Sequence, residues 1–297
     1  MARRIVAGTG RTLIALGVLM LLFVAYQLWG TNLAEASSQN SLRQQLDRQL
    51  ARPTPTTTLV PTAAPTTTTV PPLEPVPGGA VGRIQIPKIG VDKVVVEGVG
   101  EEDLKRGPGH YPETPLPGQP GNAAIAGHRT TYGAPFYNLN ELVAGDPIYI
   151  TTAQGRFEYT VTGSQVVAPT DVAVVAPTTG DRLTLTTCNP RFSAAQRLVV
   201  SAQLDLSVSP AVAPPHRDVA NLPPGKPVEA SLNEGSSGAI GPSVGWGLGA
   251  SAVWLAAWVA ARRWRRRWLP YLVGVLPFLV LLFFFFENVS RLLPTDF

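Results

Sequence analysis

The residue of this sequence best suited to covalent chemistry is its single cysteine, Cys188. One thiol cannot form an internal disulfide or fill a multi-cysteine metal site, so it is either a small buried side chain or a reactive nucleophile. A nucleophilic thiol needs a base or a cation nearby to hold the thiolate. Three histidines are available as the base, and they are His110, His128 and His216.

The segment that carries the cysteine, residues 182–188, alternates as a half-buried strand does. The predicted faces are Leu183, Leu185 and Thr187 on one side and Thr184, Thr186 and Cys188 on the other. Asn189-Pro190 then ends the strand, because proline cannot donate to a sheet ladder. The thiol is therefore predicted at a strand end, where reactive groups often lie on a rigid support.

The three histidines differ in their sequence settings. His128 follows the short apolar segment 123–127 and opens a glycine-flanked loop, so its ring can face a cleft. His110 lies in the turn-rich stretch 107–112 and is the second candidate. His216 lies between Pro215 and Arg217 in a linker, and we expect it to be solvated and without a catalytic role.

A cationic partner is expected from the strand after the cysteine. Arg197 begins that strand, after an eight-residue connection from Asn189 to Gln196. A hairpin of this length would set Arg197 beside Cys188, where its permanent charge can stabilise a thiolate or a developing oxyanion. Arg191, within the connection, is the competing arginine.

The N-terminus carries a membrane signal. Arg3, Arg4 and Arg11 precede an uncharged apolar run over 12–32, whose core, 13–30, is about 27 Å long as a helix. This length favours an uncleaved anchor. A cleaved signal peptide is the alternative, since Ala34-Glu35-Ala36 resembles a small-residue cleavage site.

Two further apolar runs, 235–261 and 268–286, lie near the C-terminus without a charge in either. Between them, residues 262–267 contain five arginines in six positions. The positive-inside rule places this loop and the N-terminus in the cytoplasm, with membrane lipid as a second contact of the arginines. We therefore expect a multi-pass cell-membrane protein whose residues from about 34 to 234 are extracytoplasmic.

The charge balance argues against nucleic acid as a partner. The chain has a formal net charge of +4, but residues 80–207 hold 10 Lys and Arg against 12 Asp and Glu. The basic residues thus gather around the apolar runs, and the middle of the chain lacks the positive surface that nucleic-acid binding requires. Acidic residues 101–103 and Asp171 show no calcium-ligand spacing, so no metal or other cofactor is predicted.

The middle of the chain reads as an all-β domain. Short segments rich in Val, Ile, Thr and Tyr are separated by Gly, Pro and Asp, a pattern typical of a barrel or sandwich. The predicted strands are 83–86, 93–97, 123–127, 147–151, 157–167, 182–187 and 197–206. Short helices are predicted over 37–50, 101–106 and 135–142. Residues 53–79 form a Pro/Thr-rich stalk that cannot bury a core.

These residues together resemble a known family. Thr184-Leu185-Thr186-Thr187-Cys188, with His128 sixty residues earlier and Arg197 nine residues later, is similar to the sortases, whose signature is Thr-Leu-x-Thr-Cys. Gly127-His128-Arg129 and the residues after Cys188 are most similar to class E sortases of actinobacteria. The resemblance covers residues 80–207 and implies a closed eight-stranded β-barrel with short helices.

The resemblance also implies a cysteine transpeptidase, which is a thiol enzyme that cleaves a peptide bond and transfers the acyl group to an amine. Cys188 would be the nucleophile, His128 the acid/base and Arg197 the oxyanion group. The substrate would be a surface protein with a C-terminal Leu-Pro/Ala-x-Thr-Gly signal, cut between Thr and Gly. The acyl group would pass to an amine of a lipid II-like peptidoglycan precursor. The predicted substrate-binding residues are Tyr111, Thr186 and Thr187.

Two other functions stay open at this point. One is a pilin-polymerising sortase, whose acceptor is a lysine of another pilin. The other is a membrane-tethered barrel that binds a partner without catalysis, with Cys188 merely packed. In each case the predicted division is an anchor (1–33), a helix and stalk (34–79), the barrel (80–207), a linker (208–238), a membrane helix (239–261), an Arg loop (262–267) and a last helix with tail (268–297).

Overall fold

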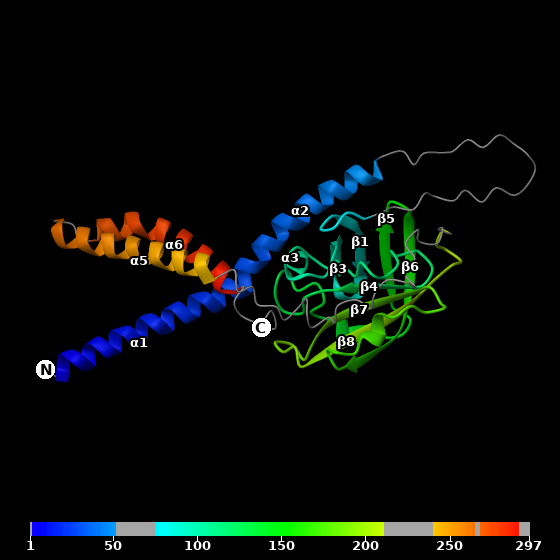
Figure 1. The fold of residues 1–297 in the computed structure, drawn as a ribbon, viewed down its shortest axis with the longest axis horizontal. Helices are drawn as coiled ribbons and strands as arrows, with labels where there is room; N and C mark the ends of the chain where they lie inside the picture. The colour runs from blue at the N-terminus through cyan, green and yellow to red at the C-terminus, as the bar shows by residue number, and fades with distance from the viewer. Residues whose placement is uncertain (1, 52–74, 211–239, 265–267, 291–297) are drawn as a thin grey trace, which may run out of the picture. The chain divides into compact units, whose positions relative to one another are not determined.

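The computed structural model describes residues 2–51, 75–210, 240–264 and 268–290 (Figure 1). The chain divides into two compact units. The described residues of one unit are 2–31, 240–264 and 268–290, and those of the other are 32–51 and 75–210. The described part of the first unit is helical, whereas the second contains all eight strands of the described residues.

The eight strands close into a single barrel in the order β1-β2-β3-β4-β7-β8-β6-β5 (Figure 1). They are β1 (Ala80–Ile86), β2 (Val91–Glu97), β3 (Gly109–His110), β4 (Asn122–Ala126), β5 (Pro147–Thr152), β6 (Gly155–Val167), β7 (Arg182–Asn189) and β8 (Gln196–Leu204). Antiparallel pairing of β1 with β5 completes the ring and leaves no open edge.

The parallel strands β4 and β7 lead to the residues of the candidate site described below. All five residues of β4 are buried, because its two faces contact different clusters. Ala123 and Ile125 face the barrel core, while Ala124 and Ala126 pack with Tyr111 on the outer side. Small alanines on the outer face let other segments approach this sheet closely.

The predicted strands all match strands of the barrel, and the prediction of a closed all-β fold is confirmed. The eighth strand, β3, was missed because two residues are too short for any alternation to register. The predicted helix over 101–106 is the single turn α3 (Glu101–Leu104). The one predicted over 135–142 contains only the 3-10 turn η3 (Leu139–Glu141).

Two further 3-10 turns, η2 (Pro87–Ile89) and η4 (Val172–Val175), connect strands of the barrel. Helix α2 (Thr31–Leu50) is longer than the helix predicted over 37–50. Leu42 and Leu46 are buried in a cluster with residues of β1 and β2, whereas Leu50 is 44% exposed. Of the three leucines spaced four residues apart along this helix, only Leu42 and Leu46 therefore pack on the barrel.

The amide of Gln39 fastens α2 to the barrel. It donates to the carbonyl oxygens of Val94 (2.9 Å) and Arg106 (2.9 Å), and its oxygen accepts from the Val94 N–H (2.7 Å). Such bonds satisfy polar backbone that the helix would otherwise bury unpaired. Helix α2 is thus part of the folded domain.

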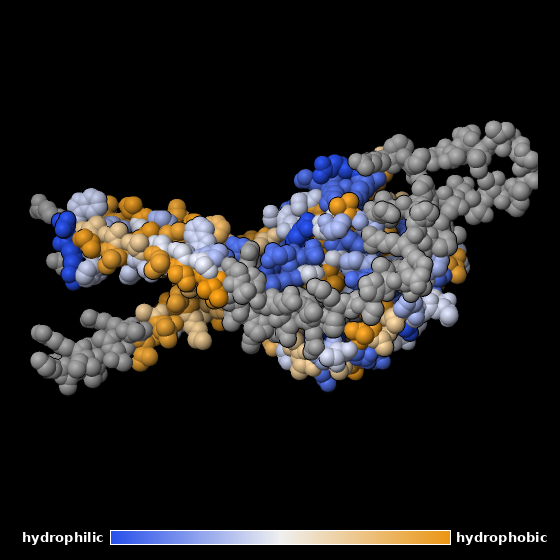
Figure 2. All heavy atoms as spheres, in the orientation of Figure 1, coloured by the Kyte–Doolittle hydropathy of each residue, from blue (hydrophilic) through white to orange (hydrophobic). Residues whose placement is uncertain are grey.

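In the first unit, α5 (Ile240–Arg263) and α6 (Leu269–Ser290) pack side by side as a hairpin (Figure 1). A Cβ added at Gly274 would lie 3.2 Å from Ala257, so the small residue permits close approach of the two helices. By length and composition, these two of the described helices could cross a membrane. Figure 2 shows apolar residues along both.

The N-terminal helix differs from the prediction of an apolar span over 13–30. Its apolar stretch is Leu13–Ala25, shorter than the other two spans. The reason is local: α1 (Ala2–Ala25) gives way to the π-helical turn η1 (Tyr26–Gly30), and α2 follows directly. Tyr26 of this turn packs edge-on against Phe283 of α6, with ring centroids 5.2 Å apart.

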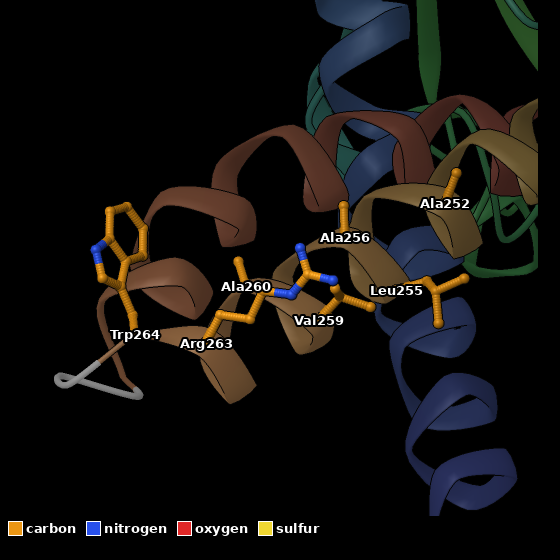
Figure 3. Close-up of a pocket in the computed structure, with 7 residues that line it drawn as sticks. All are labelled: Ala252, Leu255, Ala256, Val259, Ala260, Arg263 and Trp264. Atoms are coloured by element: carbon orange, nitrogen blue, oxygen red, sulfur yellow. The ribbon is translucent and has the colours of Figure 1, made fainter.

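A shallow groove of about 760 Å³ runs along α5 (Figure 3). Its lining combines apolar residues of α5 with Arg263 and Trp264, and Figure 3 shows the Arg263 side chain extending back along the helix. The lining residues are Ala252, Leu255, Ala256, Val259, Ala260, Arg263 and Trp264. None of them belongs to the barrel, so the groove has no part in the site described next.

Candidate active site

Cys188 is half-buried near the end of β7, and the predicted faces of that strand are found. Leu183 and Leu185 lie in the barrel core. On the other face, the Thr184 hydroxyl donates to Asn122 Oδ1 (2.7 Å), and the Thr186 hydroxyl lies 3.2 Å from the hydroxyl of Tyr111. The cysteine therefore continues a polar row on the outer face of the barrel.

Arg197 is the cross-strand partner of Cys188 in the antiparallel β7–β8 pair. The predicted hairpin proximity is thus confirmed, and the two side chains lie on the same face. Arg197 is 5% exposed, and its Nη1 donates to the carbonyls of Ala194 (2.8 Å) and Gln196 (3.1 Å). Its Nε is buried and has no hydrogen-bond partner within the described part of the chain.

His128 comes to the cysteine through the parallel β4–β7 pair. Ala126 is registered with Thr186, so His128 and Cys188 each lie two residues beyond a paired position. Two bonds extend the register: the Gly127 N–H donates to the Thr186 carbonyl (3.1 Å), and the Thr187 hydroxyl donates to the Gly127 carbonyl (2.8 Å). Imidazole, thiol and guanidinium therefore stem from three adjacent strands at one end of the barrel.

The His128 ring is 6% exposed, and its Nε2 has no hydrogen-bond partner among the residues that the structure describes. The ring lies against Tyr132, with centroids 5.2 Å apart. Burial, followed by the positive charge of Lys105, lowers the pKa of His128 to about 4. The imidazole is therefore neutral at pH 7, with one ring nitrogen available to accept a proton.

His110 has a different environment. It is 1% exposed, its Nδ1 lies 2.7 Å from Glu97 Oε2, and its Nε2 lies 2.9 Å from the Pro115 carbonyl and 3.2 Å from the Thr114 hydroxyl. Both ring nitrogens of His110 are thus bonded within the fold, which favours a structural role for this second candidate. His216 lies outside the described residues.

Arg191, the competing arginine, contacts the segment before η3. Its guanidinium carbon lies 4.1 Å from the centroid of the Tyr137 ring, and it donates to the Tyr137 carbonyl (3.3 Å) and to Asn138 Oδ1 (3.1 Å). These contacts tie the β7–β8 connection to the segment before η3. The register favours Arg197 as the arginine beside the thiol.

The predicted substrate-binding residues separate into two kinds. Tyr111 and Thr186 lie on the outer face with Cys188, and burial raises the pKa of Tyr111 to about 12, so its hydroxyl stays neutral. The charges of Arg197 and Cys188 also act on Tyr111, so the three groups share one neighbourhood. Thr187 instead supports the His128 loop through its bond to Gly127.

Sequence reasoning missed Arg129, which directly follows His128. Its side chain is 6% exposed and bonds the carbonyl oxygen of Cys188 across the gap between β4 and β7. The only signal was its place in the glycine-flanked loop. Of the acidic residues weighed as calcium ligands, Glu101 and Glu102 both pair with Lys105. Over the described residues, no group of three His, Cys, Asp or Glu could hold a metal ion.

The comparisons with known proteins point to one family. Residues 84–205 match the family described as Sortase domain. The sortase SrtE1 of Streptomyces coelicolor is 34% identical over 207 residues, which are 64% of this chain and 54% of that protein. The sortase SrtE2 of the same organism is 28% identical over 219 residues, or 68% of this chain and 83% of that protein. A solved structure of sortase E from Streptomyces avermitilis is 42% identical, covers 44% of this chain and 90% of that chain, and has a TM-score of 0.40.

Other sortase classes are also similar, over shorter stretches. Sortase D of Bacillus subtilis is 33% identical over 118 residues, which are 39% of this chain and 58% of that protein. The longer alignments with the two E-type sortases support the class E resemblance. The chain spans between half and three-fifths of the length of the first curated relatives that it matches.

Proposed function

The chain belongs to the sortase family through residues 84–205, and we propose that it is a membrane-anchored cysteine transpeptidase. Cys188 is the nucleophile, His128 the acid/base, and Arg197 the group that stabilises the oxyanion. The observation that carries this proposal is the register of β4, β7 and β8, which brings three residues distant in sequence to one end of the barrel. Among the described residues, neither His128 Nε2 nor Arg197 Nε has a hydrogen-bond partner, and this supports the proposal because a bound substrate would satisfy both buried groups.

The reaction proceeds in two acyl transfers. His128 takes the proton of the Cys188 thiol while the sulfur attacks the carbonyl carbon of the substrate threonine. Arg197 binds the oxyanion, and the C–N bond to glycine breaks as His128 returns the proton to the leaving amine. An acceptor amine then attacks the thioester and gives its proton to His128, which returns it to the sulfur.

For the substrate we propose a surface protein with a Leu-Pro/Ala-x-Thr-Gly type sorting signal. The polar row of Tyr111 and Thr186, leading to Cys188, offers hydroxyls along the outer face where an extended peptide would lie. Membrane tethering of enzyme and substrate would raise their effective concentration at one surface. No cofactor or metal enters the mechanism.

The proposed acceptor is an amine of a lipid II-like peptidoglycan precursor, and the alternative is a pilin lysine. A competition assay separates them: the full-length chain in detergent is given a sorting peptide with both a peptidoglycan-type amine and a lysine peptide. Mass analysis of the products shows which amine is joined. We expect the peptidoglycan-type product, and predominance of the lysine product would favour the pilin-polymerising function.

The non-catalytic alternative is tested on the thiol itself. A Cys188 that is only packed would react with an alkylating agent no faster than an ordinary cysteine, and Cys188→Ala would leave surface-protein anchoring intact. A catalytic thiol beside a base and two arginines reacts faster. Both results together would reject the transpeptidase.

We also propose that the catalytic domain, which follows the first helix and precedes the α5–α6 hairpin in the sequence, lies outside the cell. The arginines of the hairpin loop support a cytoplasmic position for it. The test uses a membrane-impermeant maleimide on intact cells freed of their wall. It should label Cys188 in the wild type and miss a new thiol in Cys188→Ala/Arg266→Cys. Labelling of the second variant would reject this topology.

A further inference from the structure

One charged side chain at the site has no role in the transfer steps above, and that is Arg129. It follows His128 directly, yet its guanidinium reaches the end of β7. Nη1 donates to the carbonyl oxygen of Cys188 (3.0 Å) and to Asn189 Oδ1 (2.8 Å). Nη2 donates to Oδ1 of Asn140 (2.9 Å), the middle residue of η3. One side chain thus ties the histidine loop to the backbone of the cysteine and to a third segment.

The environment makes these bonds strong. Arg129 is 6% exposed, and a hydrogen bond from a buried charged donor is worth more than one between neutral groups. Burial lowers the pKa of Arg129, as does the charge of Arg191, while Cys188 acts in the opposite direction. An arginine starts from so high a pKa that it stays protonated at neutral pH, so the site has a permanent second cation.

Arg129 and Arg197 differ in their hydrogen-bond partners. The NH groups of Arg129 that are bonded hold a backbone carbonyl and two amide oxygens, all of which are parts of the protein framework. Arg197 approaches Cys188 from the opposite strand, and its two bonds, to the carbonyls of Ala194 and Gln196, involve Nη1 only. Both arginines have a buried Nε without a partner among the described residues, but only Arg129 bonds the framework through both of its Nη atoms. This leaves Arg197 suited to the substrate and Arg129 suited to the framework.

Resting on the proposed function, we propose that Arg129 is a positioning residue, which fixes the backbone of Cys188 against the His128 loop and keeps a permanent positive charge near the sulfur. Without it, the hydrogen bonds between β4 and β7 would end at Gly127 and Thr187, short of both reacting side chains. Its loss should therefore loosen the thiol–imidazole geometry and disfavour the thiolate, while the peptide-binding face stays intact.

Other charged and titratable groups near Arg129 and Cys188 have to be considered when the thiol is titrated. They are His128 of the loop after β4, Arg197 of β8, Tyr111 after β3, Arg191 of the β7–β8 connection, Tyr137 before η3, and Lys105 after α3. Arg191 is the matched control, because it is an arginine near Arg129 whose bonds go to Tyr137, Asn138 and Asn140.

The experiment compares full-length wild type with Arg129→Met, Arg129→Lys and Arg191→Met. Iodoacetamide alkylation of Cys188 as a function of pH gives the apparent pKa of the thiol, and peptide cleavage gives kcat and KM. For Arg129→Met we expect a raised thiol pKa and a kcat at least about tenfold lower with KM nearly unchanged, as for a lost charge-assisted bond. Arg129→Lys should restore the thiol pKa because it keeps the positive charge. It should not restore kcat, because one ammonium group cannot make the bonds that the two Nη atoms of the guanidinium make. Arg191→Met should behave as wild type in both measurements.

The proposal is overturned if Arg129→Met keeps the thiol pKa and kcat of the wild type, or if Arg191→Met changes them equally. Full recovery of kcat in Arg129→Lys would overturn the positioning role of the guanidinium. Should Arg129→Met fail to fold, as judged by circular dichroism, Arg129→Lys and Asn140→Ala take its place, and both must lower kcat. The alkylation arm needs no substrate, so a chain that cleaves no sorting peptide would refute the proposed function and still report on Arg129.

Discussion

His128 and His110 are both buried histidines of one barrel, but their polar environments differ. His110 bonds through both ring nitrogens, to Glu97 on one side and to Thr114 and the Pro115 carbonyl on the other. His128 has a buried Nε2 for which the described residues provide no partner, at the end of the barrel that also carries Cys188. A satisfied network stabilises a fold, whereas an unsatisfied group on a rigid support is free to exchange a proton.

The largest difference between the two regions should appear in activity. Cys188→Ala removes the nucleophile and His128→Ala removes the proton carrier, so each should lower turnover of a sorting peptide by about a thousandfold or more. The measurement is product formation by chromatography, with Tm as the control for folding. A His110→Ala variant with the same loss of kcat at unchanged Tm would reverse the assignment of the two histidines.

A pH titration of stability sharpens the comparison. His128 has a pKa of about 4 in the folded chain and about 6.5 when unfolded, so the unfolded state takes up the proton first as the pH falls. The stability contributed by the neutral ring is present above about pH 6.5 and is lost toward pH 4. Wild type should lose about 3 kcal/mol over this range relative to His128→Gln. Parallel curves of unfolding free energy against pH would contradict the buried neutral ring.

Arg197 tests the reacting end from the other strand. Arg197→Ala should lower kcat at least about tenfold, because an oxyanion donor acts mainly in the transition state, while the barrel stays folded. Arg191→Ala serves as the control in the neighbouring connection and should keep the wild-type rate. Wild-type turnover in Arg197→Ala, together with a loss in Arg191→Ala, would show that Arg191 is the catalytic arginine.

The smallest effect on activity is expected at His110. His110→Ala removes the buried hydrogen bonds of the ring to Glu97, Thr114 and the Pro115 carbonyl, which should cost about 1–3 kcal/mol of stability. The folded fraction should cleave peptide within about twofold of wild type. Denaturant unfolding measures the first quantity and peptide cleavage the second. Unchanged stability would mean that the Glu97–His110 network does not support the fold.

The parts of the site that could be predicted are those set by strand periodicity. The alternation up to Cys188 fixed its face, and an eight-residue connection was short enough to bring Arg197 back beside it. The family resemblance supplied the closure of the barrel, because the pairing of β1 with β5 joins segments too far apart for any local pattern to specify. The strand-end setting favoured His128 over His110, and the β4–β7 register places His128 and Cys188 at equivalent positions beyond a paired residue.

The parts that could not be predicted depend on side-chain paths and on short elements. A two-residue strand such as β3 has no period to detect. The reach of Arg129 to the Cys188 carbonyl depends on how one loop folds over a neighbouring strand, which spacing along the chain does not encode. The π-helical turn at Tyr26–Gly30 likewise interrupts a run that looks uniformly apolar in sequence.

The most direct test of the convergence of Cys188, His128 and Arg197 is to trap the acyl-enzyme. The full-length chain in detergent is incubated with a sorting peptide, quenched in acid and digested, and the fragment holding Cys188 is weighed by mass spectrometry. We predict a thioester adduct on Cys188 that carries the peptide up to threonine, absent in His128→Ala and diminished in Arg197→Ala. Peptide cleavage without any adduct on Cys188, or an adduct that forms equally well in all three proteins, would contradict the account.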